Sequence, residues 1–251
     1  MVVAIVQARM SSSRLPDKVL KNILGKPAIG YLFERLKFSG HIHKIILATS
    51  VNPENDRLCD YIRSLGFDVF RGSEDDVLER YYLAAKKYAA DTIVRITGDC
   101  PLIDPQLCDQ LIDEFLKQKV DYAYLSPAFA EGLDCEVLTF SAIEKCYQNA
   151  QLISEREHVT RYIINHKDRF KIFELNNTQD HSRYRIVLDE PQDFQMLTIL
   201  FENYYGALHP RGNFLNIKEY LDAHPELIAM NAHVIRNEGI LKSLQNDKVF
   251  K

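Results

Sequence analysis

The 251-residue sequence predicts an α/β fold built around a mainly parallel β-sheet. Short runs rich in valine and isoleucine alternate with amphipathic stretches of about ten to fifteen residues, a pattern typical of repeated strand–helix–strand units. A chain of this length buries a substantial core without disulfide or metal support. We therefore expect a single domain over residues 1–251, with ligands at the carboxyl edge of the sheet.

The elements are predicted in order from local composition and from start and stop signals. The strands are expected at Val2–Val6, Lys44–Ala48, Asp68–Phe70, Thr92–Ile96, Asp121–Leu125, Glu136–Phe140 and Tyr184–Leu188. Helices are expected at Ile29–Phe38, Asp75–Tyr88 and Gln106–Gln118, and a further one begins at Pro191. The polar loops that follow the strands should then converge on one edge of the sheet.

Two segments depart from this alternation. The first is an excursion over roughly residues 126–182, where Pro127 and Gly132 interrupt the pattern and Ser141–His166 has helical composition. We interpret it as a lid or a dimer arm. The second is a tail over roughly residues 206–251, which is expected to be helical in pieces with an interruption at Pro225.

The overall charge and composition exclude several classes of protein. A net charge of −4 argues against a surface that neutralises a nucleic-acid backbone and fits a small anionic ligand better. Five cysteines without metal-ligand spacing suit reduced thiols. No apolar run reaches the length of a membrane span or of a signal peptide. We expect a cytoplasmic protein with no nucleic-acid or membrane partner.

The loop Ala8–Lys18 follows the first strand and is rich in hydroxyl and cationic side chains. Its three serines, two arginines and one lysine, with the backbone N–H groups of the loop, offer hydrogen-bond donors and fixed positive charge to a polyphosphate. Arg14 has the geometry to bind phosphate oxygens bidentately, and Lys18 to act as a point charge on the α-phosphate or the leaving pyrophosphate. Residue types alone leave this interpretation level with that of an ordinary solvated basic turn.

A second segment, Arg95–Asp104, begins in the fourth strand and continues past its end with Thr97, Gly98 and Asp99. Asp99 is placed to bind a cation, and magnesium prefers one or two carboxylates completed by phosphate oxygens. Taken alone, Asp99 is explained more simply as a turn residue. Asp104 is better explained as a helix cap.

A partner carboxylate is expected in the segment Tyr184–Phe194, where a predicted last strand ends at Asp189. Asp189 would then lie on the same edge of the sheet as Asp99, and the two could share a magnesium ion. The alternative is that Asp189 caps the helix that starts at Pro191, in whose first turn Asp193 favours the helix dipole.

Weaker signals mark the surroundings of these loops. Gly72 and Ser73 form a turn whose backbone groups are candidates for contact with a base or ribose, although a plain helix start is the simpler interpretation. Four polar residues near the excursion are candidates for a second substrate, and a solvated helix face is the alternative for the last two. These four are Asp134, Glu136, Glu157 and His158.

Taken together and in this order, these segments resemble the cytidylyltransferases that activate acidic sugars. This is the CMP-Kdo and CMP-sialic acid synthetase group, and the chain is most similar to its spore-coat polysaccharide biosynthesis (SpsF-type) branch. The resemblance covers roughly the first two hundred residues and is more specific than any single motif. It implies a Rossmann-like, GT-A-type nucleotide-diphospho-sugar transferase fold and a homodimer in which the excursion crosses to the partner.

The resemblance also implies a reaction. A sugar hydroxyl, of a nonulosonate or Kdo-like acid, would attack the α-phosphate of CTP and release pyrophosphate, for surface polysaccharide or glycan biosynthesis. It implies catalytic roles for Arg14, Lys18 and Asp99, and magnesium (Mg2+) as cofactor on Asp99 and Asp189. The nucleotide would be bound by Ala8, Arg9, Ser13, Arg14, Lys18, Gly72, Ser73, Thr97 and Gly98, and the sugar by the four candidates named above.

The sequence departs from the pattern of these enzymes at several positions. Ser11 and Asp17 stand where relatives usually carry glycine, and Cys100 stands where the Kdo branch has an acid. Aspartate tolerates left-handed backbone geometry, so the loop can still form at Asp17. Two alternatives stay open: a sugar-1-phosphate nucleotidyltransferase that uses another nucleotide, and a non-catalytic nucleotide-binding protein of the same fold.

Overall fold

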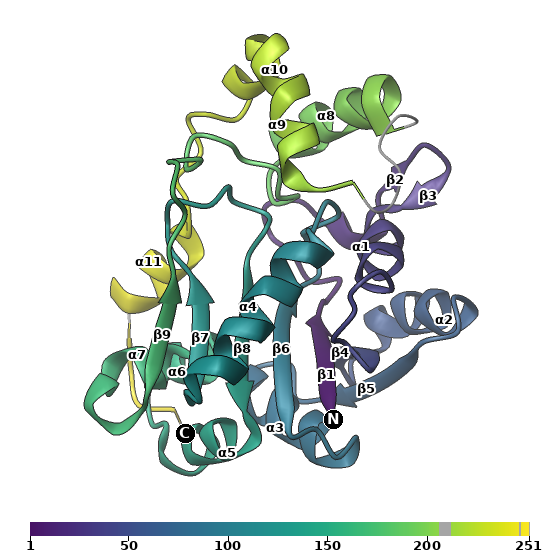
Figure 1. The fold of residues 1–251 in the computed structure, drawn as a ribbon. Helices are drawn as coiled ribbons and strands as arrows, with labels where there is room; N and C mark the ends of the chain where they lie inside the picture. The colour runs from purple at the N-terminus through teal and green to yellow at the C-terminus, as the bar shows by residue number, and fades with distance from the viewer. Residues whose placement is uncertain (206–211, 246, 251) are drawn as a thin grey trace.

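A computed structural model describes residues 1–205, 212–245 and 247–250 (Figure 1). These residues form a seven-stranded sheet in the order β5-β4-β1-β6-β8-β7-β9, and a two-stranded hairpin of β2 and β3. The strands are β1 (Val2–Gln7), β2 (Asn22–Ile23), β3 (Lys26–Pro27), β4 (Lys44–Ser50), β5 (Asp68–Gly72), β6 (Thr92–Thr97), β7 (Tyr122–Leu125), β8 (Cys135–Thr139) and β9 (Ile172–Leu175).

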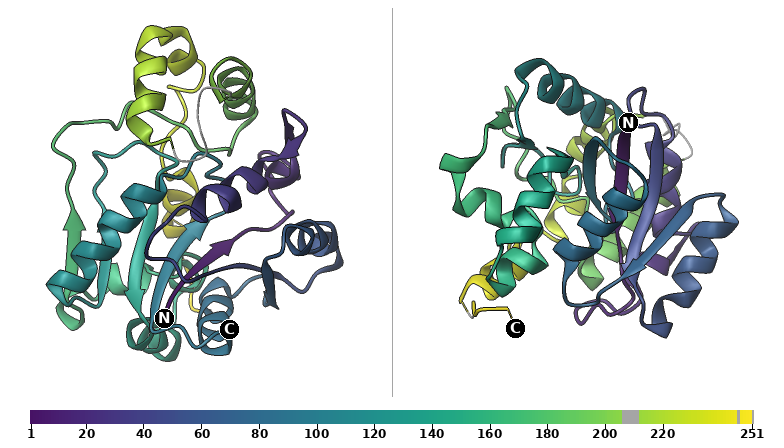
Figure 2. Two further views of the ribbon diagram at one scale, coloured as in Figure 1. Left: turned by 45° about the vertical axis from the view of Figure 1, so that its right-hand side comes forward. Right: turned by 90° about the horizontal axis from the view of Figure 1, so that it is seen from below.

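The helices lie on both faces of this sheet and at one end of it (Figures 1 and 2). They are α1 (Ala28–Leu36), α2 (Asp56–Ser64), α3 (Val77–Lys87), α4 (Pro105–Gln118), α5 (Phe140–Asn149), α6 (Ile153–Glu157), α7 (Arg161–Asn165), α8 (Pro191–Leu200), α9 (Phe214–Ala223), α10 (Pro225–Ala229) and α11 (Glu238–Gln245). Shorter turns are the 3-10 helices η1 (Lys18–Leu20), η2 (Pro53–Asn55) and η3 (Lys167–Arg169), and the π-helix η4 (Phe201–Tyr205).

The sheet is mainly parallel, as predicted. β1 pairs in parallel with β4 and β6, and β4 with β5, so these four strands end on one edge. β8 runs antiparallel to both of its neighbours, β6 and β7, a reversal that the sequence pattern does not reveal. The polar loops after β1 and β6 therefore leave the sheet side by side.

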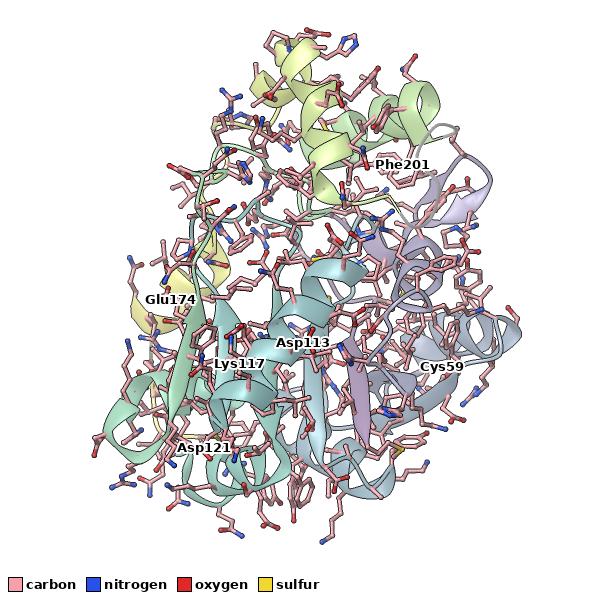
Figure 3. The ribbon with its side chains drawn as sticks, viewed as in Figure 1. Cys59, Asp113, Lys117, Asp121, Glu174 and Phe201 are labelled. Carbon is pink, nitrogen blue, oxygen red and sulfur yellow. The ribbon has the colours of Figure 1, made fainter. Side chains whose placement is uncertain are left out.

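Both faces of the central strands are buried. Along β1, Ala4 and Val6 belong to one apolar core, and Val3 and Ile5 to the other. Successive side chains of a strand point to opposite faces, so an unbroken apolar run is stable only when helices cover both sides. At one end of the molecule, Phe201 packs edge-on against Tyr31, with ring centroids 4.6 Å apart (Figure 3).

The predicted last strand, Tyr184–Leu188, is wrong as a regular strand. Its residues are extended, but they pair with two loops instead of a neighbouring strand. Glu131 donates its N–H to the Tyr184 carbonyl (3.0 Å) and accepts from Ile186 (2.8 Å), while Leu188 donates to the Asp99 carbonyl (2.8 Å). These bonds satisfy the backbone locally and attach the segment directly to the turn that carries Asp99.

The predicted excursion contributes to the central sheet. Residues 126–182 contain β8 and β9, together with α5, α6 and α7, which break the helical run Ser141–His166 into three pieces. The sequence pattern predicts a strand at β8 but none at β9. Whether this segment also crosses to a second subunit stays a prediction.

The tail forms helices in pieces, and Pro225 begins one of them, α10. Of the predicted tail, residues 206–211, 246 and 251 lie outside the described residues. The last helix, α11, returns to the main body and contacts α6, and Leu152 and Val249 form an isolated antiparallel bridge. Among the described residues, no helix is both long enough and apolar enough to cross a membrane.

Candidate active site

The loop between β1 and η1 is shaped by hydrogen bonds within it and to η2. Met10 donates its N–H to the Asn55 side chain (3.0 Å), and Leu15 donates to the hydroxyl of Ser12 (3.3 Å). Asp17 has φ 56°, in the left-handed region that favours glycine. The loop therefore forms with aspartate at this turn, as predicted, and Ser11 has no positive φ.

Lys18 lies between the two predicted metal ligands. Its Nζ is 2.6 Å from Oδ2 of Asp99 and 2.8 Å from Oδ1 of Asp189. Burial works against the charge of Lys18, but these two carboxylates outweigh it and raise the pKa of Lys18 above its ordinary value. Burial likewise opposes ionisation of Asp99, yet Lys18 lowers the pKa of Asp99 below its ordinary value. The three groups form one partly buried charged cluster.

Arg14 extends this cluster toward the cavity. It forms ion pairs with Asp189, with Glu190 at 3.1 Å, and with Glu238 of α11 at 3.7 Å. Its side chain is one-third exposed, so its guanidinium still borders open space. An incoming anion would compete with these carboxylates for Arg14.

Asp189 is held in place by a buried neighbour. Asp193 is fully buried and accepts hydrogen bonds from the N–H groups of Asp189 (3.0 Å) and Glu190 (2.8 Å) and from the guanidinium of Arg185. The N-cap of α8 is Glu190, so Asp189 is not the cap, and its carboxylate faces Lys18 and Arg14. Asp193 does more than favour the helix dipole, because it fixes the backbone that carries Asp189.

Gly98 allows the two loops to approach closely. Its N–H donates to the Gln7 carbonyl at 2.7 Å, and a Cβ at this position would lie 2.6 Å from Cβ of Ala8. Real Cβ atoms essentially never approach so closely, so a side chain here would push β1 and β6 apart.

Asp104 caps α4, as predicted. Its carboxylate accepts from the N–H groups of Gln106 (3.0 Å) and Leu107 (3.3 Å).

Arg9 lies on the other side of the loop, against Glu74. Its guanidinium is 3.0 Å from Oε1 of Glu74, which also accepts from the hydroxyl of Ser11 at 2.8 Å. Burial opposes the charge of Glu74, but bonds from Ser50 and Ser11 and the charge of Arg9 lower its pKa.

The turn after β5 is bound by Arg80 of α3, a residue that was not among the predicted site residues. The carbonyl of Ser73 accepts from Nη1 of Arg80 (2.6 Å), and Arg80 borders the cavity beside the loop, whereas Gly72 and Ser73 do not line it. Burial lowers the pKa of Arg80, and its Nε has no hydrogen-bond partner among the described residues. An arginine on the apolar side of α3, next to Tyr81, is the signal that could have revealed it.

Two adjoining cavities meet at the charged cluster. The first, about 350 Å³, is bordered by the phosphate-loop candidates, and we call it the nucleotide cavity. The second, about 420 Å³, lies beyond the cluster, and we call it the acceptor cavity. Both are bordered by Arg14, Lys18, Asp99 and Asp189. Residues of α11 also border both cavities. They were not predicted as site residues, because no sequence pattern in α11 indicates that it packs near the loop Ala8–Lys18.

The four candidates for the second substrate all border the acceptor cavity. Asp134 pairs with Arg236 at 2.9 Å, and Glu157 accepts from the hydroxyl of Ser243 at 3.0 Å. Glu136 pairs with Arg95 and accepts from the hydroxyls of Tyr122 and Thr160. His158 has a buried Nε2 with no hydrogen-bond partner among the described residues, and burial lowers its pKa below the ordinary value.

Asp99 and Asp189 provide a donor set that suits magnesium. Each presents an oxygen to the same Nζ of Lys18, so the two carboxylates are close enough to share one ion. Within the described part of the chain, no group of three or more His, Cys, Asp or Glu residues is arranged to hold a metal. A two-carboxylate site completed by phosphate oxygens is the arrangement that magnesium favours.

Comparison with known proteins decides the family. A family model described as cytidylyltransferase matches residues 3–207, which includes every loop described above. The chain belongs to the cytidylyltransferase family. This confirms the resemblance inferred from the sequence, and it identifies an enzyme of the nucleotidyltransferase class.

Relatives of this cytidylyltransferase cover most of its length. The spore coat polysaccharide biosynthesis protein SpsF of Bacillus subtilis is 31% identical over 215 residues, 80% of this chain and 86% of that protein. A cytidylyltransferase from Leptospira borgpetersenii has a structure that matches with a TM-score of 0.87 at 33% identity, covering 94% of this chain and 99% of the other.

A more distant structure has the same fold. The CMP:2-keto-3-deoxy-manno-octonic acid synthetase complexed with CTP matches with a TM-score of 0.63, covering 80% of this chain and 98% of the other. Its 17% identity shows the likeness of the fold alone. The predicted α/β fold, a mainly parallel sheet with surrounding helices, is thereby confirmed.

Proposed function

We propose that this cytidylyltransferase transfers CMP from CTP to a sugar hydroxyl, with magnesium, and releases pyrophosphate. The observation that carries the proposal is the charged cluster in which Lys18 joins Asp99 to Asp189 beneath the loop Ala8–Lys18. Transfer of a nucleotidyl group from one ligand to another is favoured by cations and carboxylates placed where the cavities for the two ligands meet.

In the proposed arrangement, the triphosphate lies in the nucleotide cavity along the loop. Arg9 and Arg14 bind phosphate oxygens, and Ser13 adds a hydroxyl donor, while Ala8 borders the same cavity. Lys18 neutralises charge that develops at the α-phosphate. Binding requires Arg14 to leave its carboxylate partners for phosphate oxygens, a change that its one-third exposed side chain allows.

The acceptor hydroxyl attacks the α-phosphorus from the acceptor cavity. The new oxygen–phosphorus bond forms as the bond to the pyrophosphate oxygen breaks, and the hydroxyl proton is lost to solvent or to a nearby base. Asp99 and Asp189 would hold magnesium, which when bound would neutralise charge on the phosphates. Thr97 and Gly98 border the nucleotide cavity, and Gly72 and Ser73 stay candidates for contact with the cytidine.

The acceptor is proposed to be a sugar bound near Asp134, Glu136, Glu157 and His158. The names of the relatives support surface polysaccharide biosynthesis, and they make a Kdo-like or nonulosonic sugar acid the first acceptor class to test. We also propose a homodimer in the cytoplasm, as the resemblance implied. All five cysteines are buried and unpaired, which suits a reducing compartment.

The test measures pyrophosphate released from CTP and magnesium in the presence of a panel of sugar acids, neutral sugars and amino sugars. We expect release that depends on one acceptor, on magnesium and on Asp99. The variant Asp99→Asn is compared with Asp113→Asn, an exposed carboxylate on α4 (Figure 3). Release from no acceptor would contradict the proposal.

Two further measurements address the alternatives. A thermal-shift screen of the four nucleoside triphosphates identifies the nucleotide, and stabilisation by UTP or GTP alone would favour a sugar-1-phosphate nucleotidyltransferase. If Asp99→Asn leaves metal-dependent CTP binding intact and no acceptor reacts, the non-catalytic alternative gains. Light scattering tests the homodimer.

A further inference from the structure

The helix α11 brings charged side chains to the site from outside the residues that the family model matches. That model matches residues 3–207, whereas α11 spans Glu238–Gln245 and is drawn in yellow in Figure 1. Glu238 and Gly239 border both cavities, and Lys242, one turn further along, borders the nucleotide cavity but not the acceptor cavity. Because residues four apart share a helix face, this face of α11 is directed at the nucleotide cavity.

The adjoining face of this segment is directed at the other cavity. Asn237, just before the helix, and Ile240 are three positions apart, and both border the acceptor cavity but not the nucleotide cavity. The helix therefore lies along the boundary between the two cavities, with Lys242 on the nucleotide side.

A row of ion pairs connects Lys242 to the loop Ala8–Lys18. Nζ of Lys242 is 2.8 Å from Oε1 of Glu238, and Oε2 of Glu238 is 3.7 Å from Nη1 of Arg14. One carboxylate thus lies between two cations. The side chain of Lys242 is 64% exposed, and an ammonium on a flexible four-carbon stem can turn from this carboxylate to phosphate oxygens nearby.

The segment that carries Lys242 is anchored on both sides of α11. Before the helix, the guanidinium of Arg236 donates to the carbonyls of Pro127 (3.0 Å) and Phe129 (2.8 Å). After it, Asp247 accepts from the hydroxyl of Ser154 (2.5 Å). No residue of α11 is buried, so little apolar packing opposes a small shift of the helix between these anchors.

We infer that Lys242 binds the terminal phosphates of CTP, the part of the nucleotide that leaves as pyrophosphate. The inference rests on the proposed function, because it requires a triphosphate along the loop, and it adds a binding residue to that site. The α-phosphate is expected where Lys18 and Asp99 border both cavities, whereas Lys242 borders only the nucleotide cavity. Glu238 joins Lys242 to Arg14, the arginine assigned to phosphate oxygens, which indicates the phosphate end of the nucleotide and not the cytidine.

The experiment measures binding of CTP and of CMP to the full chain by titration calorimetry with magnesium. Lys242→Gln removes the charge and keeps most of the side chain. We expect its Kd for CTP to rise roughly three- to tenfold, as suits a partly exposed contact, and its Kd for CMP to stay within about twofold of the wild type. Lys248→Gln is the control, because Lys248 is exposed in the same tail and borders neither cavity.

A second pair of variants separates direct from indirect action. In Lys242→Gln, Glu238 has lost one partner and could hold Arg14 more firmly, which would weaken CTP binding without any contact from Lys242. The Glu238→Gln background removes this route. We expect Lys242→Gln to raise the Kd for CTP by a similar factor in that background. If it has no effect there, Lys242 acts only through Glu238, and the inference is overturned.

The outcomes keep the inference distinct from the proposed function. If the wild type binds no CTP with magnesium, the proposed function fails and the inference with it. If the wild type binds CTP and Lys242→Gln binds it equally well, only the inference is overturned. A loss that is as large for CMP as for CTP also overturns it, because CMP lacks the phosphates assigned to Lys242.

Discussion

Replacing Lys18 with methionine removes the ammonium group that joins Asp99 to Asp189. The side chains of these three residues are only 14–20% exposed, so the two carboxylates would face each other with little solvent to screen them. Loss of one partner from a fully buried ion pair costs about 3–5 kcal/mol, and the partial exposure here lowers this to about 2–3 kcal/mol. For a chain of this size that corresponds to a fall in Tm of roughly 5–10 °C.

The loss should depend on pH in a defined direction. Because Lys18 lowers the pKa of Asp99, the pair contributes stability above the ordinary carboxylate pKa of 3.8, and this stability is lost as the pH falls through the lowered value. In Lys18→Met, burial of Asp99 is no longer offset by Lys18, so its pKa should rise. The variant then regains stability as the pH falls toward 4, and its deficit is greatest near neutral pH.

Divalent cations should rescue the variant. Magnesium can take the position of the ammonium group between the carboxylates, so its addition should raise the Tm of Lys18→Met by more than that of the wild type. The assay is thermal unfolding at pH 7 and pH 4.5, with EDTA or with magnesium. Lys117→Met is the control, because Lys117 is exposed on α4, where it pairs with Glu114 at 2.8 Å (Figure 3).

Two results would refute this reasoning. Equal Tm values for Lys18→Met and the wild type at pH 7 in EDTA would show that the ammonium group of Lys18 does not stabilise the folded protein. A deficit that is as large at pH 4.5 as at pH 7 would show that methionine acts by packing and not by charge.

Three further substitutions test the geometry of the site. Gly98→Ala should lower the free energy of unfolding by about 1–3 kcal/mol and weaken CTP binding, because its Cβ would meet that of Ala8 at 2.6 Å; calorimetry that finds both unchanged would refute the close approach. Asp193→Ala should cost about 3–5 kcal/mol in urea unfolding, since it leaves the buried Arg185 without this partner. A loss below 1 kcal/mol would contradict its central position. Glu238→Gln should lower the Kd for CTP by roughly two- to fivefold, because Glu238 competes for Arg14 at 3.7 Å; titration calorimetry showing weaker binding would count against it.

The sequence by itself determined the parts of this protein that depend on neighbouring residues. Unbroken valine and isoleucine runs, as in β1, require burial on both faces and so indicate a parallel sheet covered by helices. Asp104 before Pro105 predicts a helix start, and the structure confirms it. The composition of the loop Ala8–Lys18 leaves a phosphate site level with a solvated basic turn, and only the resemblance to a family favours the phosphate site, which stays a prediction.

Only the tertiary structure decided what depends on residues far apart in the chain. The reversal of β8, the extended segment at 184–188 and the position of β9 arise from long-range pairing, which leaves no local pattern. Lys18 and Asp189 are 171 positions apart, and only the folded chain brings them to 2.8 Å. The availability of each charge is also a tertiary property, because a cation such as Arg95 can bind a ligand only to the extent that its neighbours leave it unmatched.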